Sequence, residues 1–322
     1  MTSEREDRLE TGMTAVIALG GNALSPPGEH SSIADQFRHT RDSLGPIVDL
    51  AGEGWNVCIV HGNGPQVGDE LVRNEVSRAE VAPLPLGVLV ASTAGWIGYM
   101  VQQSVENALR RIGSVRKVAT VITQIEVDPL DPALSAPTKF IGHEIPRDRA
   151  DALVAEGHSV QLDPRGHLRR VVGSPSPLAI HEIEVIRHLL RQGVIVIACG
   201  GGGIPVYRDP RLGLEGVDAV VDKDLASAVL ARELEADLFL ILTDVDAVYA
   251  NWGTKGQRPL TNLTVDEARR MDSEDAFGEG SMAPKVRAAA DYVRSTGGRA
   301  IITELSRGLD AVHGRAGTTI AR

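Results

Sequence analysis

Aromatic residues are scarce in this sequence. Its 322 residues include four Phe, three Trp and four Tyr, 3% of the total, whereas 43% of all residues are hydrophobic. A chain of this length can bury a sizeable core, and here that core must be built mainly from Val, Ile, Leu and Ala. Such a composition is typical of a buried parallel sheet covered by helices.

Cysteine is also scarce, and excess positive charge and long apolar runs are missing. The only cysteines, Cys58 and Cys199, lie within short apolar runs, which indicates buried thiols rather than a disulfide or a metal site. A formal net charge of −10 gives no overall attraction to nucleic acid or to an anionic membrane. No run is long enough to span a membrane, and residues 1–12 lack the apolar centre of a signal peptide. We therefore expect a cytoplasmic protein with a disordered extension at 1–12.

Several well-known catalytic motifs are absent. The sequence has neither the G-x-x-x-x-G-K-[ST] pattern of P-loop enzymes nor the G-x-G-x-x-G pattern of dinucleotide-binding domains. It also has no Cys/His cluster with metal-ligand spacing and no G-x-S-x-G turn around a nucleophilic serine. If the protein binds a nucleotide, it must do so with other residues.

Apolar, β-branched runs alternate with helical patterns along the chain. The runs are Ala15–Leu19, Val57–Val60, Val118–Thr123, Val194–Ala198, Leu238–Leu242 and Arg299–Leu305. The predicted helices are Trp96–Leu109, Leu225–Leu234, Val265–Met271 after a capping box of Thr264 and Glu267, and a last long helix around Val286–Val293 that Gly297 ends. This alternation predicts an α/β fold with a mainly parallel sheet.

Residues 126–180 do not fit that alternation. The stretch is rich in Pro, Asp and Arg, and it is too long and irregular for an ordinary connection between elements. We expect residues 13–322 to form a single domain with a protruding lid subdomain inserted at about 126–180.

Glycine-rich loops follow three of the predicted strands. They are Gly20-Gly21-Asn22, then His61-Gly62-Asn63-Gly64, and Gly200-Gly201-Gly202-Gly203. In an open parallel sheet, ligands bind at the carboxyl ends of the strands, and glycine lets backbone N–H groups approach a phosphate closely. One such loop is explained equally well as a tight turn, and a single His beside glycine is more often structural than catalytic. Three loops together predict an anion-binding crevice.

Lysines in informative positions supply the complementary charge. Lys223 stands at the start of one predicted helix, Lys285 at the start of the last long helix, and Lys139 within the predicted lid. Phosphoryl transfer is catalysed mainly by positioning and by neutralising the charge of the transferred group, which lysines on several sides can do. Asp224, beside Lys223, could hold the lysines by ion pairing. Taken singly, each lysine would be read as a surface residue, so the hypothesis depends on lysines and glycine loops occurring together.

Nine motifs resemble those of the carbamate kinase family, within the wider amino-acid kinase group. In chain order they are ALGGNAL, VHGNGPQVG, GWIGYMVQQ, PTKFIG, GGGGIPV, VDKDLAS, LTDVDAVY, GSMAPK and AGTTI. They come in that family's order and spacing from about Met13 to Arg322. HGNGPQVG, GGGGIPV and DKDLAS are specific to carbamate kinases within the group.

The resemblance implies a three-layer α/β/α sandwich with a protruding subdomain, working as a homodimer on small-molecule substrates. It implies reversible phosphoryl transfer between ATP and carbamate, with Mg²⁺ on the nucleotide. From the net charge and the lack of a spanning run, we expect neither nucleic acid nor a membrane as a partner. The implied catalytic residues are Lys139, Lys223, Asp224 and Lys285. Those implied at the phosphate and carbamoyl groups are Gly20, Gly21, Asn22, Gly62, Asn63, Gly64, Gly201 and Gly202, and those at the nucleotide are Thr243, Asp244, Val245, Tyr249, Met282 and Pro284.

One departure from the family pattern concerns the acceptor side. Where the family usually has Ser-Gln-Gly, this chain has Thr93-Ala94-Gly95. A polar amide is lost, which would alter the substrate or lower the activity if it lies near the acceptor pocket. Two alternatives therefore stay open. One is a related kinase acting on an amino-acid carboxylate or a nucleoside monophosphate, and the other is a nucleotide-binding sensor without catalysis, against which the three retained lysines argue.

Overall fold

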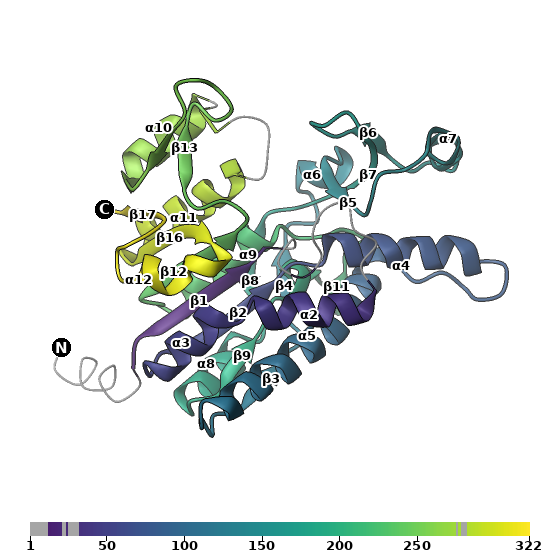
Figure 1. Ribbon diagram of the computed structural model, residues 1–322. Coiled ribbons are helices and arrows are strands. Elements are labelled where there is room, and N and C mark those ends of the chain that lie inside the picture. The colour runs from purple at the N-terminus through teal and green to yellow at the C-terminus, as the bar shows by residue number, and fades with distance from the viewer. Residues whose placement is uncertain (1–11, 21–23, 25–31, 275, 278–281) are drawn as a thin grey trace.

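An eight-stranded sheet forms the centre of the computed structural model (Figure 1), in which residues 12–20, 24, 32–274, 276–277 and 282–322 can be described. The strand order is β15-β17-β16-β12-β1-β2-β9-β3, and all neighbours are parallel except β16 and β17. The bounds are β1 Thr14–Leu19, β2 Asn56–His61, β3 Val118–Thr120, β9 Ile195–Ile197, β12 Leu238–Thr243, β15 Asn262–Thr264, β16 Arg299–Glu304 and β17 Thr318–Ala321. The predicted mainly parallel sheet is confirmed.

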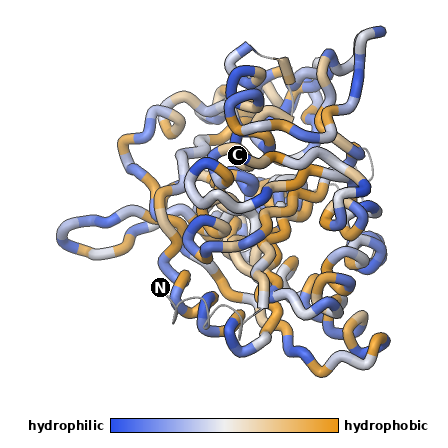
Figure 2. Tube along the Cα trace, turned by 90° about the vertical axis from the view of Figure 1, so that its left-hand side faces the viewer, coloured by the Kyte–Doolittle hydropathy of each residue, from blue (hydrophilic) through white to orange (hydrophobic). Residues whose placement is uncertain are grey.

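Helices cover both faces of this sheet, because alternate strand residues point to opposite sides. In β1, Val16 and Ala18 join one apolar cluster, and Ala15, Ile17 and Leu19 join the other. The first cluster is covered by α8 Ile183–Arg191, α9 Lys223–Glu233, α10 Val265–Ser273 and α11 Met282–Thr296; the second by α2 Ile33–Asp42, α3 Gly45–Gly52, α5 Leu86–Arg111 and α12 Gly308–Val312. Figure 2 shows hydrophobic residues concentrated along the central strands. The three-layer α/β/α sandwich is therefore confirmed.

The described residues also form two smaller sheets and a hairpin. One sheet has the order β11-β10-β4-β8, the other β5-β7-β6, and the hairpin pairs β13 with β14. Their bounds are β4 Gln124–Val127, β5 Lys139–Ile141, β6 Val160–Leu162, β7 Leu168–Val172, β8 Pro177–Ile180, β10 Ile204–Asp209, β11 Gly213–Gly216, β13 Val248–Ala250 and β14 Arg258–Leu260. Together with α6 Pro132–Ser135 and α7 Arg147–Ala155, the β5-β7-β6 sheet projects from the sandwich beside α4 Gly64–Ser77 (Figure 1).

The observed elements correct several predicted boundaries. The strand predicted to end at Thr123 stops at Thr120, because the next residues cross to the second sheet, where β4 begins at Gln124. The helix predicted from Trp96 begins at Leu86, since tertiary packing overrides the weak helix propensity of its Gly- and Val-rich first turns. The capping box is present, with Thr264 accepting from the N–H of Glu267. No helix in the described residues is long and apolar enough to cross a membrane.

Candidate active site

The glycine loops meet because their strands are neighbours. β12, β1, β2 and β9 lie side by side and parallel, so the loops after them share one edge of the sheet. A Cβ on Gly200 would stand 2.6 Å from Nε2 of His61, and one on Gly201 would stand 2.2 Å from Nδ2 of Asn63. The loop after β9 is thus packed directly onto the loop after β2, and only glycine fits at this contact.

Two of the predicted phosphate-binding glycines use their backbone N–H groups in hydrogen bonds within the protein. The N–H of Gly20 donates to the carbonyl of Leu242 at 2.9 Å, which extends the ladder between β1 and β12. The N–H of Gly202 donates to the carbonyl of Cys199 at 2.9 Å within a tight turn. Each N–H therefore already has an acceptor within the protein. Gly21 and Asn22 lie outside the described residues.

Asn63 is held by the residue that departs from the family pattern. Its Nδ2 donates to Oγ1 of Thr93 at 2.9 Å, and Oγ1 in turn lies 2.9 Å from the carbonyl of Leu89. Both side chains are buried. A threonine thus keeps the hydroxyl that a serine would supply. Ala94 is buried in the same turn of α5, where a Cβ on Gly200 would stand 3.1 Å from its methyl group.

The predicted lysines converge on two aspartates. Asp224 forms an ion pair with Lys223 through Oδ1 and one with Lys285 at 3.1 Å through Oδ2. Lys139 of β5 instead forms an ion pair with Asp222. The side chains of Lys223, Lys285 and Asp224 are at most 13% exposed. Three ammonium groups face two carboxylates, so the cluster keeps one positive charge net.

Burial and the neighbouring charges shift the pKa values of Asp224 and Lys223 in this cluster. Burial would raise the pKa of Asp224, but the charges of Lys223 and Lys285 outweigh it and hold this pKa well below its usual value. The pKa of Lys223 is lowered, first by burial and also by the charge of Lys285, although Asp224 opposes the shift. Burial works against the charged form of both partners, and the two lysines decide the balance at Asp224. A dianionic phosphoryl group would find net positive charge at a site with little water.

Sequence reasoning missed Asp222. Its Oδ1 accepts from the N–H groups of Asp224 at 2.8 Å and Leu225 at 3.2 Å, so it caps α9. The capping role is visible in the sequence, because aspartate before a helix is a common N-cap. The pairing with Lys139 was not, because 83 residues separate the two.

The predicted nucleotide-binding residues lie on two segments. Thr243 ends β12 and is followed by Asp244 and Val245, while Tyr249 lies on β13 and donates to Oδ1 of Asp246 at 2.7 Å. Met282 and Pro284 lie in the first turn of α11. That turn also carries Lys285, so the predicted nucleotide and phosphoryl sites share an element.

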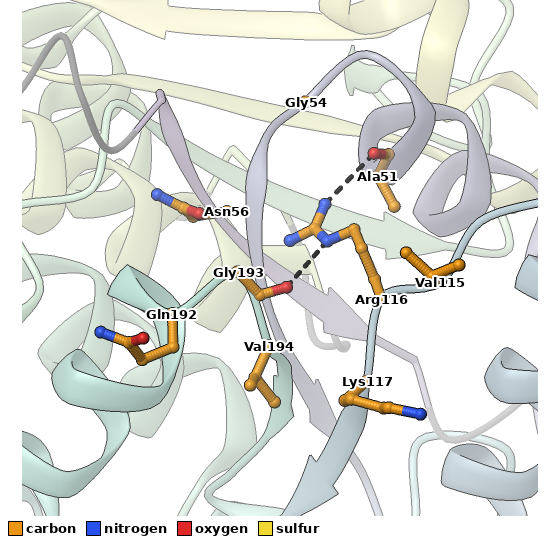
Figure 3. Close-up of a pocket in the computed structure, with 9 residues that line it drawn as sticks. All are labelled: Ala51, Gly54, Asn56, Val115, Arg116, Lys117, Gln192, Gly193 and Val194. Carbon is orange, nitrogen blue, oxygen red and sulfur yellow. Dashed lines mark hydrogen bonds between the residues drawn. The ribbon is translucent and has the colours of Figure 1, made fainter.

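A separate cavity of about 410 Å³ lies at the opposite end of the strands (Figure 3). It is lined by Ala51, Gly54, Asn56, Val115, Arg116, Lys117, Gln192, Gly193 and Val194. Arg116 donates to the carbonyls of Gly193 at 2.9 Å, Ala51 at 3.1 Å and Trp55 at 2.7 Å. These bonds tie the loop before β3 to the end of α3 and to the loops before β2 and β9, so we assign Arg116 a structural role. None of the predicted site residues lies here.

Comparison with known proteins places the chain in a family. Residues 13–304 match the model of the amino acid kinase family. A carbamate kinase from Pyrococcus furiosus is 42% identical over 312 residues, covering 96% of this chain and 99% of that protein. The chain belongs to the carbamate kinases of the amino acid kinase family.

Solved structures agree with this assignment. A carbamate kinase from Giardia lamblia bound to citric acid superimposes with a TM-score of 0.91 at 38% identity, covering 97% of this chain and 99% of that one. The same enzyme bound to AMP-PNP gives a TM-score of 0.89 at 37% identity with the same coverage. The family resemblance seen in the motifs is thereby confirmed, and so is the assignment as a kinase.

Proposed function

We propose that the chain transfers a phosphoryl group reversibly between ATP and carbamate. In the ATP-forming direction, ADP and carbamoyl phosphate yield ATP and carbamate. The observation that carries this proposal is the cluster of Lys139, Lys223 and Lys285 around Asp222 and Asp224, at the edge of the sheet where the glycine loops meet. The AMP-PNP bound to the Giardia lamblia enzyme supports a nucleotide as one substrate.

The cluster suits direct transfer. In the direction of carbamate phosphorylation, a carbamate oxygen forms a bond to the γ-phosphorus while the bond to the ADP oxygen breaks. The carbamate oxygen is already anionic, so no residue has to remove a proton from it. The lysines neutralise the charge on the transferred group and hold it in line, which is where most of the catalysis of such reactions lies. Asp224 keeps two of the ammonium groups fixed.

The acceptor side of the proposal involves the loop after β2. Gly62, Asn63 and Gly64 border the carbamoyl group, with the Asn63 amide oriented by the hydroxyl of Thr93. The amide that Ala94 lacks is therefore not needed to hold Asn63. Thr243, Asp244, Val245, Tyr249, Met282 and Pro284 border the nucleotide, and the segment at 126–180 acts as the lid.

Mg²⁺ belongs to the proposal as a companion of the nucleotide. The described part of the chain contains no group of three or more His, Cys, Asp or Glu side chains that could hold a metal ion. Mg²⁺ commonly binds substrate phosphates with few protein ligands, so the ion would be carried by ATP or ADP. Bound there, it would neutralise phosphate charge together with the lysines.

A cytoplasmic homodimer completes the proposal. Val88 and Tyr99 of α5 and Ile33 of α2 are about half exposed, at 47%, 57% and 54%. A second copy of the chain could cover these apolar side chains. Light scattering of the purified protein would distinguish a dimer from a monomer.

The deciding experiment measures ATP formed from carbamoyl phosphate, ADP and Mg²⁺. Wild-type protein should form ATP, and Lys223→Ala should form almost none. Lys117→Ala is the matched control, because Lys117 is exposed at the opposite end of the sheet and should leave the rate unchanged. No ATP from a folded, ADP-binding wild type would refute the proposal and redirect the search to other small carboxylate acceptors.

A further inference from the structure

Asp222 bonds to two separate parts of the site at once. Its Oδ1 caps α9 by accepting from the N–H groups of Asp224 and Leu225, and its Oδ2 accepts from the ammonium of Lys139. The Asp222 side chain is 13% exposed, whereas that of Lys139 is 39% exposed. One carboxylate therefore joins the start of α9 to the start of β5.

The joined elements carry different members of the lysine cluster. Helix α9 begins at Lys223, and its Asp224 also binds Lys285 of α11. Lys139 begins β5, which belongs to the projecting three-stranded sheet and not to the sandwich. The position of Lys139 relative to the other two lysines thus depends on how the projecting sheet is attached.

Backbone contact fixes β5 at its far end. The N–H of Gly142, just after β5, donates to the carbonyl of Gly64 at 3.0 Å. A Cβ on Gly68 would stand 2.1 Å from the Cα of Gly142, so α4 and this segment touch backbone to backbone. That contact places the far end of the strand, whereas its start is tied to the sandwich through the long, flexible side chain of Lys139 and that side chain's own partner.

Asp222 supplies that partner. Within the described residues it is the carboxylate with which Lys139 forms an ion pair, while Asp224 is occupied by the other two lysines. The cap anchors the Asp222 side chain through its other oxygen, so the ammonium is held by a group that is itself fixed. A mobile ammonium would be a poor catalyst, because misplacement by about 1 Å can cost roughly a hundredfold in rate.

We propose that Asp222 is a positioning residue for phosphoryl transfer, which holds the Lys139 ammonium of the projecting sheet against the start of α9, beside Lys223. This inference rests on the proposed function. It assigns Asp222 no contact with the substrate, and its effect on the rate passes through Lys139.

A double-mutant cycle tests the inference. Asp222→Asn keeps an oxygen for the cap and loses the charge, and Lys139→Met removes the ammonium. In the wild-type background, Asp222→Asn should lower kcat for ATP formation by about 10- to 100-fold with little change in KM. In the Lys139→Met background, assayed at high enzyme concentration, it should cause no further loss.

Hydrogen exchange gives a readout that needs no turnover. Asp222→Asn should speed amide exchange in residues 139–141 and leave the first turn of α9 unchanged. Glu156→Gln is the control, because it removes another ion pair of the same segment, with Arg78 at the end of α4, and should preserve kcat.

The outcomes separate the alternatives. Equal losses from Asp222→Asn in both backgrounds, or faster exchange in α9 with none in residues 139–141, would show a helix cap only and overturn the inference. If the wild type forms no ATP, the proposed function fails, and the exchange data still decide whether Asp222 holds Lys139.

Discussion

Acid should destabilise the folded chain through His61. The imidazole is fully buried, with Nδ1 3.0 Å from the carbonyl oxygen of Gly62, and burial lowers its pKa from 6.5 to about 4. Between these pH values the unfolded chain binds a proton that the folded chain does not. The contribution of the neutral, buried His61 to the free energy of unfolding is therefore fully present above pH 6.5 and is lost as the pH falls toward 4.

The size of the effect follows from the two pKa values. A shift from 6.5 to about 4 corresponds to roughly 3 kcal/mol over the whole range, since one pKa unit is about 1.4 kcal/mol. Between pH 7 and pH 5, proton linkage gives a loss of roughly 2 kcal/mol in the free energy of unfolding. That is a large part of the stability of a typical domain.

Urea unfolding at pH 7 and pH 5 measures this loss. His61→Asn is the partner variant, because its amide can reach the carbonyl of Gly62 but does not titrate. Wild type should lose roughly 2 kcal/mol more than His61→Asn over this interval. Every other group is common to both proteins and cancels in the comparison. Equal losses in the two proteins would refute the reasoning.

Three further predictions concern the site. Thr93→Val leaves the Asn63 amide without its acceptor and should lower the free energy of unfolding in urea by about 1–3 kcal/mol. It should also raise the KM for carbamoyl phosphate, whereas Thr93→Ser keeps the hydroxyl and should retain the KM; equal KM values in the two variants would contradict this. Because burial lowers the pKa of Lys223 below its ordinary 10.5, the rate of ATP formation should begin to fall below pH 10.5 as the pH is raised. Lys223→Arg should lower the rate and abolish this alkaline limb of the pH–rate profile. An unchanged alkaline limb in the variant would assign it to another group. Gly68→Ala should push β5 away and lower kcat more than about tenfold. Gly45→Ala is the control, because an added Cβ there meets nothing within 4 Å, and it should leave kcat unchanged. A fully active Gly68→Ala would show that the backbone contact between Gly68 and Gly142 is dispensable.

Local patterns in the sequence were sufficient for much of the fold. The capping box of Thr264 and Glu267 involves residues three apart, so the sequence displays both partners together. The central strands are apolar on both faces, which is why their runs were visible. The start of α5 was missed because Leu86–Gly95 is stabilised by packing that depends on distant segments.

The site was predictable in its residue types but not in its pairings. Glycine after a strand indicates room for close approach without saying what approaches. At Gly201 the close neighbour is the Asn63 side chain, and at Gly20 the N–H is taken by β12. In the same way, the contact between Lys139 and Asp222 depends on how the projecting sheet sits on the body, which no local pattern encodes.

Because its two cysteines are buried, the chain can be labelled at an introduced cysteine without first removing its own. Burial raises the pKa of Cys58 to about 12, and burial likewise raises that of Cys199, so neither thiol should react with maleimides in the folded state. A cysteine introduced at Val154, which is 56% exposed on α7, would then be the single reactive thiol. A spectroscopic probe attached there could report directly on movement of the projecting sheet as substrates bind.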